Sequence, residues 1–267
     1  MTIPTSPPPE FQVLDALFRS DHAALGRLFA NGVVNIDAPR AGRSVGPGQA
    51  KALAERWPGL FNVRAGQAVL TQRFTTAADG RFVCEIMAQV ASPEGALVDL
   101  PIGVMGQRAV DGSLEEVRIY HYQKAVTGEI GFRPSAFPRR EDERLGMAED
   151  MPGVNASYFR AANGGDVEGA LALFTPDAWI EIGGRIFNTP GQRRRMYEFF
   201  LKDVGMQLLF SCITFDGVNF ALEWTAGHAN REAGLAVYEC TGEDRIASIR
   251  MYDTFDPANI PGLMQGG

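Results

Sequence analysis

The stretch LEEVRIYHY, residues 114–122, has a counterpart later in the chain, IASIRMYDT, residues 246–254. Both begin with an apolar residue, two variable residues, an apolar residue, arginine, an apolar residue and tyrosine, which is typical of a strand. They differ in the residue after the tyrosine, which is His121 in the first stretch and Asp253 in the second. The chain therefore repeats one strand with a different titratable residue in each copy, which indicates a duplicated domain.

Three further matches support the duplication because they occur in the same order along the chain. They are Leu28–Phe29 with Leu173–Phe174, GPGQ at 46–49 with TPGQ at 189–192, and Glu85 with Glu223. The chain has 267 residues, which is long enough for two domains of ordinary size. We therefore predict a first domain at 10–126, a linker rich in proline and charge at 127–152, and a second domain at 153–257.

Each predicted domain begins with helices and ends with strands. Apolar residues recur at helical spacing in 11–29 and again in 154–174, and Asp21 and Asp166 are placed to cap a second helix in each segment. Strand-length apolar or alternating runs follow, and they end at the two stretches quoted above. This order predicts an α+β fold in which helices pack on one face of an antiparallel sheet.

Composition argues against several classes of function. The net charge is −7, so a nucleic-acid or anionic-membrane surface is not expected, and the run 193–195 of three arginines fits a solvated helix face better than an anion site. Three cysteines without CxxC spacing and three histidines without HxH or HExxH spacing predict no metal site. No phosphate-binding glycine motif occurs, so no nucleotide cofactor is expected. The chain lacks signal-peptide and membrane-span patterns, and we expect a cytoplasmic protein.

The segments around the repeat resemble a known superfamily. Nuclear transport factor 2-like proteins are similar to two segments of this chain, LFANGVVNIDAP at 28–39 and NGGDVEGALALFTPDAWIEI at 163–182. Each segment is followed by a turn with Pro-Gly and by a predicted third helix. The nearest resemblance is to SnoaL-like polyketide cyclases and ketosteroid isomerases. It implies two tandem cone-shaped α+β barrels, each with a curved sheet wrapped on helices around an apolar pocket. Because such proteins are usually dimers, the two copies would pack as a pseudo-dimer, in a monomeric chain or a homo-oligomer.

Strand alternation predicts which residues of the repeated strand face that pocket. Val117, Ile119 and His121 share one face of the first copy, and Ile249, Met251 and Asp253 share the matching face of the second copy. An apolar face with one titratable group is typical of a ligand pocket. We therefore predict substrate contacts from Val117, Ile119 and Met251 and catalytic roles for His121 and Asp253. The alternative is that His121 only bonds a neighbour and Asp253 only ends its strand.

Asp37 is a further candidate for a general base. In ketosteroid isomerases an aspartate on the strand after the Leu-Phe element removes the proton, and Asp37 matches it by gap-free counting from Phe29, although Ala38 precedes the proline here. Apolar surroundings would raise the pKa of such a carboxyl toward neutrality. The same count reaches Ile182 in the second copy, so this base is expected only in the first. The alternative is a turn residue at a strand end.

The isomerases also use a tyrosine on the first helix to hold the substrate oxygen. Counting back from the capping aspartate, that position is Tyr158 in the second copy and Val13 in the first. A pocket tyrosine on the third helix matches Tyr197, where the first copy has Ala54. The acid that isomerases carry on a late strand is missing, since Gly103 and Leu235 occupy its positions. The resemblance thus gives two diverged pockets, and we expect chemistry mainly in the first, with Asp37 and His121. Trp57 is added as a possible substrate contact, although tryptophans are more often core residues.

Together these features predict a cofactor-independent acid–base enzyme that acts on a small hydrophobic, ring-containing or aromatic molecule. Isomerisation, dehydration, cyclisation and retro-aldol-type cleavage all begin by removing a proton beside a carbonyl or hydroxyl group. One alternative is a binding protein that uses the same apolar pocket without catalysis. Another is a structural module whose cone is filled.

Overall fold

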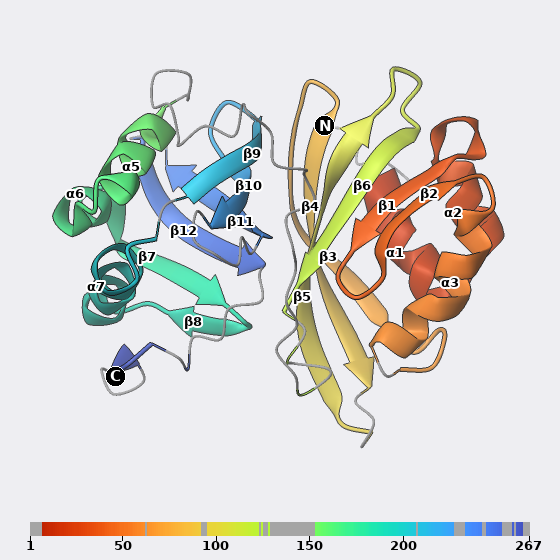
Figure 1. Ribbon diagram of the computed structural model, residues 1–267, viewed down its shortest axis with the longest axis horizontal. Coiled ribbons are helices and arrows are strands. Elements are labelled where there is room, and N and C mark those ends of the chain that lie inside the picture. Colours follow the sequence, from red (N-terminus) through yellow and green to blue (C-terminus); the bar gives the residue numbers. More distant parts are fainter. Residues whose placement is uncertain are drawn as a thin grey trace. The chain divides into compact units, whose positions relative to one another are not determined.

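The computed structural model describes residues 7–61, 63–91, 95–122, 124, 128, 153–206, 208–226, 233–241, 244–252, 258 and 260–263. The chain divides into two compact units, Met1–Gly131 and Phe132–Gly267, called here the first half and the second half (Figure 1). Most of the predicted linker lies outside the described residues. The packing of the halves as a pseudo-dimer and the exact domain limits stay predictions.

The first half begins with helices and ends with long strands, as the sequence predicts. Its helices are α1 (Pro9–Arg19), α2 (His22–Leu28) and α3 (Gln49–Leu60), with a short 3₁₀ turn η1 (Ala30–Gly32). Its strands are β1 (Val34–Ala38), β2 (Gly42–Gly46), β3 (Val69–Ala78), β4 (Arg81–Ala91), β5 (Leu97–Arg108) and β6 (Leu114–His121).

The second half repeats this order of elements. Its helices are α5 (Val154–Asn163), α6 (Val167–Leu171) and α7 (Pro190–Glu198), and α7 continues into a π-helical turn η3 (Phe199–Asp203). Its strands are β7 (Phe174–Ile182), β8 (Arg185–Phe187), β9 (Leu208–Phe215), β10 (Phe220–Ala226), β11 (Ala233–Thr241) and β12 (Arg245–Tyr252).

The two halves have the same sheet topology. The strand order is β2-β1-β6-β5-β4-β3 in the first half and β8-β7-β12-β11-β10-β9 in the second. All neighbours are antiparallel except β1 with β6 and β7 with β12, which are parallel. The sheets are therefore mixed where the sequence predicts antiparallel ones, because the last strand of each half returns beside the first after a long crossover. The α+β class and the duplication are confirmed.

In each half the helices cover one face of the sheet (Figure 1). Side chains alternate between the faces of a strand, so each strand contributes every second residue to the core beneath the helices. The predicted caps are present: the carboxylate of Asp21 accepts from the backbone N–H of Ala24, and that of Asp166 accepts from Gly169. Each cap satisfies an otherwise unpaired N–H at the start of a short helix, which fixes where the second helix begins.

Candidate functional site

The core face of the second-half sheet is organised in three rows of side chains that follow the strand register. The first row contains Phe220, Tyr238, Ile249 and Ile180; the second contains Leu222, Ala236, Met251 and Ile182; the third contains Trp224 beside Gly234. Small residues at 234 and 236 lie between the large ones of the neighbouring strands. This arrangement leaves room between the sheet and the helices.

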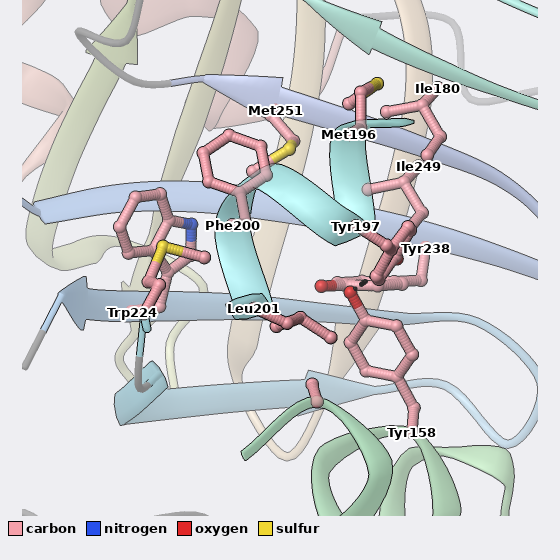
Figure 2. A pocket seen from close by; sticks show the side chains of 12 residues that line it. Tyr158, Ile180, Met196, Tyr197, Phe200, Leu201, Trp224, Tyr238, Ile249 and Met251 are labelled. Atoms are coloured by element: carbon pink, nitrogen blue, oxygen red, sulfur yellow. Dashed lines mark hydrogen bonds between the residues drawn. The ribbon is translucent and has the colours of Figure 1, made fainter. Parts of the chain in front are cut away.

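A pocket occupies that room (Figure 2). It contains about 500 Å³ of space not filled by protein atoms, part of which is open to solvent, and about 40 Å³ of it can hold the centre of a water-sized sphere. Twelve described residues line it, eleven from α5, α7, η3, β7, β10, β11 and β12 and Met206 from the segment after η3. Eight of them are aliphatic, methionine or phenylalanine. The polar groups come from three tyrosines, Tyr158, Tyr197 and Tyr238, and from the indole of Trp224. An apolar cavity with a few polar groups is the usual form of a small-molecule site.

The three tyrosines form one cluster. The hydroxyl of Tyr158 lies 2.8 Å from the hydroxyl of Tyr197, and either can be the donor. Tyr158 also shares a side-chain hydrogen bond with Tyr238. The ring of Tyr158 meets both neighbours edge to face, at centroid distances of 6.3 Å from Tyr197 and 5.3 Å from Tyr238. Three hydroxyl groups from two helices and one strand therefore meet at one end of the pocket.

Local structure explains why these side chains are held in place. Tyr158 and Ala162 are four residues apart on α5, so both face the pocket. Tyr197 lies on α7, whose start is fixed by a capping box between Thr189 and Gln192. The ring of Tyr238 stacks on Phe220 of the neighbouring strand, with centroids 4.1 Å apart and an interplanar angle of 11°.

Burial keeps all three tyrosines protonated. Loss of solvent is the largest cause of the raised pKa of Tyr158, and the hydrogen bonds from its two neighbours oppose that rise. The same desolvation raises the pKa values of Tyr197 and Tyr238 well above the ordinary value of 10.0. Neutral hydroxyls can donate to a ligand oxygen, and in a low-dielectric pocket such donors stabilise developing negative charge strongly. The cluster is therefore suited to binding a carbonyl or phenolic oxygen.

The matching place in the first half has no such cluster. Val13 and Ala54 occupy the positions of Tyr158 and Tyr197. Gly106 is the counterpart of Tyr238, because Gly106 lies opposite Val117 in the strand register as Tyr238 lies opposite Ile249. None of the three can donate a side-chain hydrogen bond. The oxygen-binding groups of the second half thus have no counterpart in the first.

Aromatic rings fill the core of the first half. Phe18, Trp57, Phe61 and His121 form a chain of ring contacts with centroids 4.8 to 6.2 Å apart. Trp57 is fully buried, and His121 is 4% exposed against Phe61. His121 faces the core, as strand alternation predicts, but it lies in a packed aromatic cluster. Val117, Ile119 and Trp57, predicted as substrate contacts, are buried core residues of the first half.

The proposed role of Asp37 as a pocket base conflicts with the strand register. Val34, Ile36 and Ala38 are core residues, so Asp37 belongs to the opposite face of β1. In the strand register Asp37 lies opposite Arg118, just as Glu181 lies opposite Arg250 in the second half. The counterpart of Asp37 in the second half is therefore Glu181 and not Ile182. The turn η1 adds one residue between Phe29 and β1, and a slip of one residue moves a side chain to the other face of a sheet.

Three of the predicted residues, Tyr158, Tyr197 and Met251, line the pocket of the second half. Asp253 lies outside the described residues.

The three arginines in the run 193–195 make contacts within the protein. Arg193 is buried and donates to backbone carbonyls, including that of Asn188, and Arg194 forms an ion pair with Glu168. Within the described ranges, no cluster of His, Cys, Asp and Glu could hold a metal ion. No helix in the same ranges has the length and apolar character to cross a membrane.

Sequence reasoning missed two of the four pocket residues that carry polar groups, Tyr238 and Trp224. Alternation along β11 could have placed Tyr238 on the face of Ala236, but a strand that is buried on both faces hides which face is the core. The general expectation that tryptophans are core residues conceals the place of Trp224 in the pocket. Its place in the third row, beside Gly234, becomes visible only from the register.

Comparison with solved structures gives matches that each extend over one half of this chain. An epoxide hydrolase/cyclase-like enzyme of pyran ring formation in the polyether salinomycin is 24% identical, with 38% of this chain and 87% of that chain covered and a TM-score of 0.33. A putative polyketide cyclase from Sinorhizobium meliloti is 18% identical, with 39% and 98% covered and a TM-score of 0.35.

A protein from Catenulispora acidiphila with a ketosteroid isomerase-like fold, in complex with trimethylamine, is 16% identical, with 46% and 92% covered and a TM-score of 0.38. No protein-family model matches the sequence, and no curated protein matches it significantly. Each half of the chain is similar in fold to a single nuclear transport factor 2-like domain.

Proposed function

We propose that the second half binds a small hydrophobic ring compound and catalyses proton transfer on it without a cofactor, as an isomerase or lyase. The observation that carries this proposal is the meeting of three neutral tyrosine hydroxyls in an apolar pocket. A carbonyl oxygen placed against Tyr158 would gain negative charge when a neighbouring carbon loses its proton. Fixed donors aimed at that oxygen lower the barrier because they need no rearrangement during the reaction.

The base in this proposal is Asp253. In the sequence it follows Met251, a pocket residue, by two positions, which is the spacing of residues on one face of a strand. Aspartate is one of the side chains that serve as a general base in such proton transfers. Tyr158 and Tyr197 would hold the substrate oxygen, and Met251 and Ile249 would contact the ring.

The test uses 2-tetralone, a two-ring ketone whose protons beside the carbonyl exchange with deuterium from water. We expect the protein to accelerate this exchange, measured by NMR, and Tyr158→Phe to slow the protein-dependent rate by roughly 100-fold, the usual cost of one lost oxyanion donor. Asp253→Asn should slow it by at least roughly 100-fold, the range for a general base. Variants must retain the circular dichroism spectrum of the parent protein.

The second candidate function is ligand binding without catalysis. The favouring observation is that the described residues lining the pocket include no carboxylate and no histidine. In that case 2-tetralone would bind, with quenching of tryptophan fluorescence, but its exchange rate would equal the rate in buffer. That result would reject the enzymatic proposal and leave the binding site intact.

A further inference from the structure

Trp224 has an unpaired donor in the wall of the pocket. Its side chain belongs to the core face of β10 and lines the pocket, and the residue is only 6% exposed. Its indole nitrogen Nε1 is buried and has no hydrogen-bond partner among the described residues. An N–H group that is buried without an acceptor lowers stability, by roughly 1–3 kcal/mol in typical proteins. Most tryptophan N–H groups in protein interiors find a partner for this reason.

The unpaired donor and the tyrosine cluster lie at opposite ends of the pocket (Figure 2). The indole nitrogen is on the side of Trp224 that faces the other lining residues in this view. The register gives the separation along the sheet: Tyr238 pairs with Phe220, and Trp224 follows Phe220 by four residues on β10. At about 3.3 Å per residue, the two rows are roughly 13 Å apart. A molecule of two fused rings with a substituent at each end spans a distance of this order.

The lining between these ends determines which kind of molecule fits. The residues between them are apolar, including Met251 and Leu201 (Figure 2), and the described lining contains no lysine, arginine or histidine. A ligand with a permanent negative charge would lose its hydration without gaining an opposite charge. A neutral ligand with oxygen acceptors at both ends would satisfy the hydroxyl cluster and the indole N–H together.

From these observations we infer that Trp224 is a second polar anchor, which selects neutral two-ring ligands that carry a hydrogen-bond acceptor at the end remote from the tyrosines. This inference rests on the proposed function, because it assumes that the tyrosine cluster holds the first oxygen. Trp224 then determines specificity and takes no part in proton transfer. The matching position in the first half is Ile86, which has no donor.

The test compares two probes that differ at one atom. The first is 6-acetyl-2-naphthol, whose hydroxyl suits the tyrosine cluster and whose acetyl oxygen would reach Trp224. The second is 6-isopropenyl-2-naphthol, in which a CH₂ group replaces that oxygen. Dissociation constants are measured by calorimetry for the parent chain and for Trp224→Phe, which keeps a large aromatic ring but removes the N–H group.

We expect Trp224→Phe to raise the dissociation constant of the acetyl probe by roughly three- to tenfold, the contribution of one neutral hydrogen bond. The dissociation constant of the isopropenyl probe should stay within about twofold of its value for the parent chain. An equal change for both probes, including no change, would overturn the inference while leaving the proposed function standing. Failure of both probes to bind the parent chain would overturn the inference and the proposed binding site together. The matched control Tyr158→Phe should weaken both probes alike, because it acts at their shared hydroxyl.

Discussion

At the scale of single residues, Tyr158 is the centre of the site because its hydroxyl bonds both Tyr197 and Tyr238. Removing its hydroxyl should therefore affect a bound oxygen more than removing either partner's. We predict that Tyr158→Phe weakens 2-naphthol binding by roughly tenfold and Tyr197→Phe by less, since a typical hydrogen bond is worth about 1 kcal/mol. Calorimetric titration of both variants checks the order. A larger loss for Tyr197→Phe would mean that Tyr197 is the direct donor.

The buried tyrosines also make stability depend on pH. Desolvation raises the pKa of all three, so the folded protein retains protons that the unfolded chain loses above about pH 10. Burial likewise raises the pKa of the Cys84 and Cys240 thiols from 9.0 to about 12. The stabilisation is complete below the unfolded pKa values and is lost as pH rises through them.

We therefore predict that the free energy of unfolding falls as pH rises from 9 toward 11, measured by urea denaturation at each pH. The slope follows from the unfolded state binding fewer protons than the folded state. Tyr197→Phe should reduce the slope because it removes one hydroxyl group whose pKa is raised in the folded protein. A free energy of unfolding that stays level across this range would contradict the burial of the tyrosine cluster.

At the scale of elements, the close approach of β5 to β6 depends on Gly106. A Cβ atom at this position would lie 1.9 Å from the backbone oxygen of Glu116, which is far inside van der Waals contact. The backbone must shift to admit even a methyl group, so we predict that Gly106→Ala destabilises the first half by at least about 1–3 kcal/mol. Thermal or urea unfolding measures the change.

The matched control is Gly59→Ala on α3, where a Cβ atom would meet nothing within 4 Å. Alanine favours a helix more than glycine does, by up to about 1 kcal/mol, so this variant should be as stable as the parent or slightly more stable. Equal effects of the two substitutions would show that the contact at Gly106 is not close.

The elements also show what the sequence could and could not predict. The count back from the capping Asp166 to Tyr158 succeeds because the turn between α5 and α6 matches the turn between α1 and α2: in each, the N–H of the capping aspartate donates to the carbonyl five residues before it. Tyr197 is matched by its place on the third helix, which forms as predicted. The count to Asp37 failed because it crosses the turn η1, where Asn31 adopts a left-handed conformation (φ 54°) and one residue is inserted. Local periodicity carries no information on such an insertion, and the sheet register is needed to detect it.

Long-range pairing was equally hidden from the sequence. The repeated strand predicts β6 and β12 correctly, but their parallel partners β1 and β7 are about 80 and 70 residues away in the chain. Whether a core is filled or hollow depends on which side chains meet across the rows. Trp57 and Phe61 pack against each other in the core of the first half, while Ala236 shares a row with the pocket residue Met251 in the second.

At the scale of the whole molecule, the two halves share a topology but differ in their cores. We expect the first half to support the fold without taking part in proton transfer. Asp37→Asn and His121→Leu should leave 2-tetralone exchange within about twofold of the parent rate, whereas Asp253→Asn should lose at least roughly 100-fold, the range for a general base. NMR exchange rates at equal protein concentration check this. Loss of exchange in Asp37→Asn alone would move the chemistry to the first half.

The central claim is that the pocket of the second half holds a ligand oxygen against the tyrosine cluster. A crystal structure of the chain with bound 2-naphthol tests it most directly. We predict the naphthol ring between Met251 and Ile249 and the helices, with its oxygen within hydrogen-bond distance of the hydroxyl of Tyr158 or of a neighbouring tyrosine. A naphthol molecule in the core of the first half, or one in the second half with its oxygen directed away from all three tyrosines, would contradict the account.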